Sequence, residues 1–60
     1  MEKFAISVQE LAEQLGISLP KAYELTKRTG FPVIRIGTRV LIPVAELRRW
    51  LTENAAHHGR

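Results

Sequence analysis

The sequence contains neither cysteine nor aspartate, and both absences restrict what the chain can do. Without cysteine there can be no disulfide framework and no thiolate ligand for a metal ion. The sequence also offers no paired carboxylates in a predicted pocket and no glycine-rich phosphate loop. Its 60 residues leave little room for a substrate cavity of about 300 Å³ or more. We therefore expect no enzymatic activity and no cofactor.

Long apolar runs are missing as well. No stretch approaches the roughly 20 residues of a membrane span, and the first residues do not show the pattern of a signal peptide. The adjacent His57 and His58 cannot close a zinc shell by themselves, so we expect them to lie in a solvated tail. These features predict a soluble, cytoplasmic protein with no metal site and no membrane partner.

Positive charge is concentrated in the middle of the chain. The net charge is +3, and residues 18–43 carry five basic side chains against the single acidic side chain of Glu24. The basic residues are Lys21, Lys27, Arg28, Arg35 and Arg39. Such a concentration is typical of a surface that faces nucleic acid. A solvated face that serves solubility alone would show the same charge.

A helix-turn-helix corner is predicted near the start of the chain. Ser7 and Glu10 fit a capping box that begins a helix, and Gly16 ends it, because glycine adopts a left-handed conformation at little cost. Ala12 is the small residue that a steep helix crossing requires, and Ile17 is the apolar residue that fills the corner. An ordinary antiparallel helical hairpin would share some of these features. The inward stripe of the helix comprises Val8, Leu11, Ala12 and Leu15.

A second short helix follows at once. Ser18 is its expected N-cap, Pro20 lies in its first turn, where a missing N–H costs nothing, and Gly30 is expected to close it. Its predicted inward stripe runs through Ala22, Leu25 and Thr26 to Thr29.

The rest of the chain predicts a hairpin and a third helix. The β-branched runs Val33–Ile36 and Val40–Ile42 flank Gly37, with a loop of two residues or slightly more. Both strands are expected to pack on the core. Pro43 marks the start of the last helix, whose apolar stripe stops at about Asn54. That stripe comprises Val44, Leu47, Trp50 and Leu51. Trp50 and either Phe4 or Phe31 should supply much of the core.

The predicted fold is mostly α with a small β-hairpin, in the order helix, turn, helix, hairpin and helix. This is a winged helix-turn-helix, which we place at residues 1–54, with residues 55–60 as a flexible tail. If its second helix enters the major groove, the start and the outward side of that helix meet DNA. The candidate contacts are Ser18, Pro20, Lys21, Tyr23, Glu24, Lys27 and Arg28.

Two of these residues admit two interpretations each. Tyr23 either offers its hydroxyl to a phosphate or forms a half-buried edge of the core. Glu24 either accepts a hydrogen bond from a cytosine amino group or pairs with Arg28 one turn later. Lys21 is the best candidate for a base or phosphate contact.

The hairpin is predicted to act as a wing. Arg35, Thr38 and Arg39 lie at or near its tip, where they can contact backbone phosphate or the adjacent minor groove. Alternatively, the two arginines only protect the edges of the sheet. We expect the second helix and the wing to form one cationic surface.

Residues 6–51 resemble the excisionase-type winged helix-turn-helix domain, which is related to the DNA-binding heads of MerR-type regulators. The resemblance rests on Ser18, Tyr23, Phe31-Pro32, Arg35-Ile36-Gly37, Ile42-Pro43 and Trp50-Leu51. Lys21 and Glu24 stand where the family often has threonine and arginine, so the resemblance does not carry over a target sequence.

The resemblance implies a bacterial, phage or mobile-element protein that binds double-stranded DNA in the nucleoid. The leading expectation is a recombination directionality factor, which binds sites beside an attachment site and helps an integrase carry out excision. Cooperative self-association on DNA fits this role. A small MerR-like transcriptional regulator is the first alternative. A protein–protein adaptor is an alternative of another class.

Overall fold

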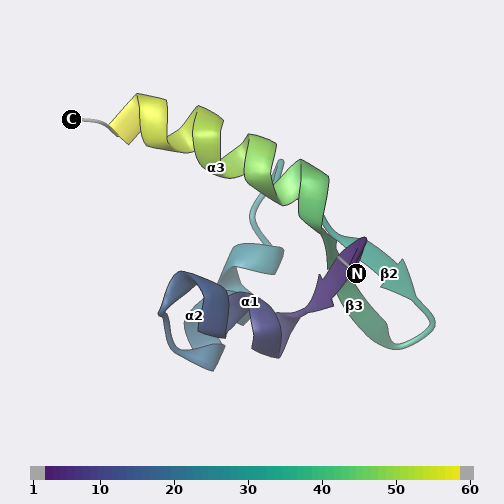
Figure 1. Ribbon diagram of the computed structural model, residues 1–60. Coiled ribbons are helices and arrows are strands. Elements are labelled where there is room, and N and C mark those ends of the chain that lie inside the picture. Colours follow the sequence, from purple (N-terminus) through teal and green to yellow (C-terminus); the bar gives the residue numbers. More distant parts are fainter. Residues whose placement is uncertain (1–2, 59–60) are drawn as a thin grey trace.

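The computed structural model describes the backbone of residues 3–58 and the side chains of residues 3–55. Its elements are β1 (Ala5–Ser7), α1 (Val8–Leu15), α2 (Leu19–Thr26), β2 (Ile34–Ile36), β3 (Arg39–Pro43) and α3 (Val44–His58). Figure 1 shows α1 and α2 side by side, the hairpin of β2 and β3 at one side, and α3 crossing above them. The predicted winged helix-turn-helix is confirmed, and the hairpin with its turn is the wing.

The start of α1 follows the predicted capping box. The Glu10 backbone N–H donates to the Ser7 hydroxyl oxygen at 3.1 Å, and the Ser7 backbone N–H donates to the Glu10 carboxylate at 3.1 Å. Lys3 Nζ pairs with the other Glu10 carboxylate oxygen at 2.5 Å. The hydrogen bond from Lys3, followed by the one from Ser7, holds the pKa of Glu10 below its ordinary value.

The corner between the first two helices also forms as predicted. Gly16 caps α1 with a φ of +67°, a conformation that a side chain would strain. The Ile17 backbone N–H donates to the Ala12 carbonyl oxygen at 3.0 Å, which turns the chain towards α2. Ile17 then packs against the core, as Leu15 does.

The second helix ends earlier than predicted, at Thr26 rather than near Gly30. The Thr26 hydroxyl donates to the Tyr23 carbonyl oxygen at 2.7 Å. The Lys27 backbone N–H, whose α-helical acceptor would be that same carbonyl, donates instead to Glu24 at 3.1 Å. The helix thus tightens into a final turn and stops. Thr29, expected to point inward, is exposed.

The hairpin belongs to a three-stranded antiparallel sheet of order β1-β3-β2, and β1 was not predicted. Ile6 of β1 pairs with Ile42 of β3, which is fully buried. The outer strand β2 does not pack on the core as expected, because Ile34 and Ile36 remain 42% and 58% exposed. Among the described strands, β1 and β3 pack against the helices, whereas all three residues of β2 are exposed.

One compact core holds these elements together. Its buried apolar residues are Val8, Leu11, Ala12, Ala22, Phe31, Ile42 and Leu47. Of the two candidate phenylalanines, Phe31 is buried and Phe4 is 95% exposed. The Phe31 ring meets the Trp50 ring edge to face, with centroids 4.8 Å apart, which joins the loop after α2 to α3.

The last helix continues past Asn54, where it was expected to stop, and ends at His58. Two further alanines, Ala55 and Ala56, are strong helix formers. The side chains of His57 and His58 lie outside the described residues. No helix in the described part of the chain has the length and apolar character required to cross a bilayer.

Candidate nucleic-acid interface

One face of α2 packs against the core, and the rest of the helix surface is open to contact with a partner. Ala22 is fully buried and Thr26 is 8% exposed, so this face packs inward. The Ser18 hydroxyl oxygen accepts a hydrogen bond from the Lys21 backbone N–H at 3.4 Å and caps the helix, with Pro20 in the first turn. All predicted contact residues of this segment are exposed: Ser18, Pro20, Lys21, Tyr23, Glu24, Lys27 and Arg28.

The exposed residues of α2 fall on two flanks. Lys21 and Tyr23 are two positions apart, so they project about 200° apart around the helix axis. On one flank lies a hollow that we call the Lys21 hollow, lined by Ile17, Lys21, Glu24, Leu25 and Arg28. On the other lies the Tyr23 hollow, lined by Ser7, Val8, Gln9, Tyr23, Thr38, Arg39 and Val40.

The Tyr23 hollow joins three elements that are separate in the sequence. Tyr23 comes from α2, Thr38 and Arg39 from the wing, and Gln9 from the first turn of α1. Tyr23 of α2 and the tip of the wing therefore line one hollow together with the start of α1. Gln9 was not among the predicted contacts, because nothing in the local sequence indicates that the start of α1 adjoins the wing.

Lys21 does not share a hollow with the wing. It lies with Arg28 on the far flank of α2. The basic residues expected to form one surface thus line two hollows on opposite flanks of the helix, Lys21 and Arg28 in one and Arg39 in the other.

The two wing arginines also separate. Arg35 pairs with Val40 across the hairpin and Ile36 pairs with Arg39. Because side chains alternate between the faces of a strand, Arg35 and Arg39 leave opposite faces of the hairpin. Only Arg39 lines the Tyr23 hollow. The loop that joins the strands has two residues, with Gly37 at a φ of +61° followed by Thr38.

Of the two interpretations of Glu24, the pairing with Arg28 is not found among the described residues. The ion pairs among the described residues are Lys3–Glu10 and Glu46–Arg49. An (i, i+4) pair requires a continuous helix, and Arg28 lies two residues beyond the end of α2. The Glu24 carboxylate is consequently exposed without a basic partner.

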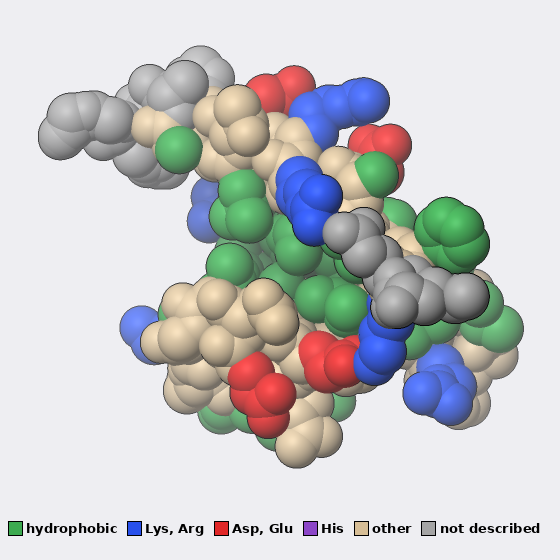
Figure 2. Space-filling view, viewed as in Figure 1, with side chains coloured by type: hydrophobic (Ala, Val, Ile, Leu, Met, Phe, Trp, Pro, Cys, Tyr) green, Lys and Arg blue, Asp and Glu red, His purple; other side chains and the backbone are tan. Residues whose placement is uncertain are grey.

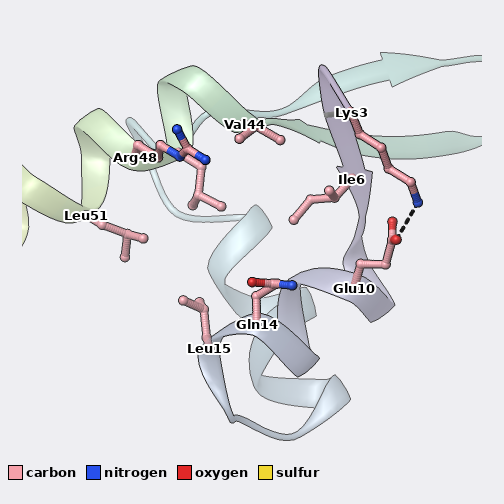
Figure 3. A pocket seen from close by; sticks show the side chains of 9 residues that line it. Lys3, Ile6, Glu10, Gln14, Leu15, Val44, Arg48 and Leu51 are labelled. Atoms are coloured by element: carbon pink, nitrogen blue, oxygen red, sulfur yellow. Dashed lines mark hydrogen bonds and ion pairs between the residues drawn. The ribbon is translucent and has the colours of Figure 1, made fainter. Parts of the chain in front are cut away.

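A larger hollow lies between α1, β1 and α3, and Figure 2 shows apolar side chains gathered below α3. Its volume is about 450 Å³, so the expectation that this chain lacks room for such a cavity is wrong. Figure 3 shows Ile6, Leu15 and Leu51 around it, with the Lys3–Glu10 pair at one end. Its lining contains no histidine, serine or threonine. Within the described residues, no group of acidic, histidine or cysteine side chains could hold a metal ion.

A family model described as "Helix-turn-helix domain" matches residues 5–55, which run from β1 into the last turns of α3. No curated protein and no solved structure matches the chain.

Proposed function

The chain belongs to the helix-turn-helix domain family, and on that premise we propose that it binds double-stranded DNA with α2 in the major groove. In this arrangement the wing rests against the neighbouring backbone. The candidate contacts predicted from the sequence remain part of the proposal, with roles that now depend on their flank.

The observation that carries this proposal is the pair of hollows on either side of α2. An α-helix with its side chains is about 10–12 Å across and the major groove is about 12 Å wide. A helix in the groove therefore has one DNA strand at each flank. Lys21 and Arg28 would meet the phosphates of one strand, and Arg39 those of the other.

The outermost residues of α2 would then face the base edges. Pro20, Glu24 and Lys27 lie on the side opposite the buried Ala22. Because Glu24 forms no ion pair among the described residues, a cytosine amino group is the natural donor to its carboxylate. Ser18 lies at the N-terminal end of α2, where it can meet a base or a phosphate.

Arg35 would act apart from the other contacts. Its side chain projects from the face of the hairpin opposite that of Arg39. It would therefore reach the DNA backbone or minor groove beyond the DNA strand that Arg39 contacts.

For the biological role, we propose an excision cofactor that acts in the bacterial cytoplasm. A single module of this kind buries roughly 600–1,000 Å² against DNA, which gives modest affinity. Several copies on adjacent sites, or an integrase held on the same DNA, would supply the missing specificity. Footprinting on the DNA around the gene for this protein should then show adjacent repeats beside a recombination site. One isolated operator at a promoter would instead favour a transcriptional regulator.

Fluorescence anisotropy with a random duplex tests DNA binding itself. We expect binding at low salt and an affinity that falls steeply as salt rises, with a slope of about −0.9 per phosphate contact on a double-logarithmic plot. Absence of binding at low salt would refute the proposal and favour a protein–protein adaptor.

A further inference from the structure

The Tyr23 hollow combines a single positive charge with several neutral hydrogen-bond donors. We propose that it holds one phosphate of the DNA backbone, with Gln9 as a ligand beside Tyr23, Thr38 and Arg39. This inference rests on the proposed function and adds to it a defined site and a contact residue on α1. The ligand is a phosphodiester, because one basic side chain surrounded by neutral donors matches one negative charge.

Within the part of the chain that the structure describes, four polar side chains that line the hollow are unpaired. The side chains of Gln9, Tyr23, Thr38 and Arg39 make no hydrogen bond or ion pair within the described residues. Each can donate to an oxygen acceptor: an amide, two hydroxyls and a guanidinium. Val8 and Val40 supply an apolar lining between them. Residues that carry donor groups therefore line one hollow from three elements.

The local charge favours an anion. Of the described residues that line the hollow, Arg39 alone carries a formal charge. Glu10 lies nearby on α1, but it does not line the hollow and its carboxylate is paired with Lys3 and bonded by the Ser7 backbone N–H. The first turn of α1 adds the partial positive charge of a helix start.

The hollow on the opposite flank is less suited to such a site. Its basic residues, Lys21 and Arg28, share the lining with the carboxylate of Glu24. A phosphate held inside it would lie close to like charge, so Lys21 and Arg28 would contact the backbone outside the hollow. The Tyr23 hollow would consequently fix the register of the domain on DNA, since a phosphate held by α1, α2 and the wing at once leaves little freedom of rotation.

A double-mutant cycle tests the shared phosphate. Affinity for a random duplex is measured by fluorescence anisotropy for the full chain, Tyr23→Phe, Arg39→Ala and the double variant. Both side chains are exposed, so thermal melts should confirm that the variants stay folded. Each single change should weaken binding severalfold. Because both side chains would contact one phosphate, the loss of affinity in the double variant should be smaller than the product of the two single losses by about threefold or more. A second cycle with Gln9→Ala and Arg39→Ala should show the same shortfall in the loss of affinity.

Lys21→Ala with Arg39→Ala provides the matched control, because these residues lie on opposite flanks and their effects should multiply. Arg39→Ala should also reduce the salt slope by about 0.9, whereas Tyr23→Phe and Gln9→Ala, which remove no charge, should leave it unchanged. If the effects of Tyr23→Phe and Arg39→Ala multiply, or if Tyr23→Phe or Gln9→Ala binds as the parent does, the shared site is wrong although DNA binding stands. Failure of the parent chain to bind would refute the proposed function as well.

Discussion

Replacement of both Lys21 and Arg39 by glutamate should weaken duplex binding by about 100-fold or more at low salt. A hydrogen bond to a charged group contributes about 1.5–3 kcal/mol, or roughly tenfold to 100-fold in affinity. The two residues lie on opposite flanks of α2 and would serve different strands, so both contributions are lost together. The new carboxylates would also repel the phosphates. Fluorescence anisotropy against one duplex at several salt concentrations measures the effect.

The control for this prediction is Arg48→Glu with Arg49→Glu on α3. Either double reversal lowers the net charge by four units, from +3 to −1. A difference between the two variants therefore reports where the charge lies rather than how much there is. We expect the α3 variant to lose far less affinity. Equal losses would show that binding follows net charge alone and would remove the case for an interface at α2.

Replacement of Leu11 by alanine should unfold a large fraction of the chain. Leu11 is fully buried at the centre of the core, and a buried leucine-to-alanine change costs about 2–5 kcal/mol. A domain of 60 residues has about 3–9 kcal/mol in total, at roughly 0.05–0.15 kcal/mol per residue. Urea denaturation followed by circular dichroism measures the loss.

Leu51→Ala is the matched control for that change, since Leu51 is 36% exposed on α3. It should cost about 1 kcal/mol or less, because much of the side chain already meets water. If Leu11→Ala proves as mild as Leu51→Ala, the core does not depend on the contact between α1 and its neighbours as the structure indicates.

Features that depend on residues close together in the sequence were predictable from it. The capping box of Ser7 and Glu10 and the left-handed turn at Gly16 both rest on short-range geometry, and both are confirmed. The order of helices and hairpin followed from apolar periodicity in the same way. These signals are local, so no tertiary contact was needed to interpret them.

The errors arose where a distant or competing contact decides the outcome. The end of α2 depends on the hydrogen bond that the Thr26 hydroxyl donates to the Tyr23 carbonyl oxygen. The spacing of apolar residues does not predict this bond. The strand β1 has only three residues, and it forms because β3 supplies its hydrogen-bond partners from more than thirty residues away. The exposure of β2 follows from its place at the edge of that sheet.

The same distinction applies to the candidate interface. The sequence identified basic residues on α2 and the wing, but their division between two flanks requires the three-dimensional position of the helix. Gln9 could not be found at all, because only the packing of α1 brings it to Tyr23 and Arg39.

The central claim, that α2 and the wing together form the DNA-binding surface, is tested most directly by nuclear magnetic resonance mapping. A random duplex is titrated into the isotope-labelled chain and the backbone amide shifts are followed. We expect the largest changes at Gln9, across residues 18–28 and across residues 37–40, with little change at Glu46 and Arg49. Changes centred on α3 instead would contradict the account.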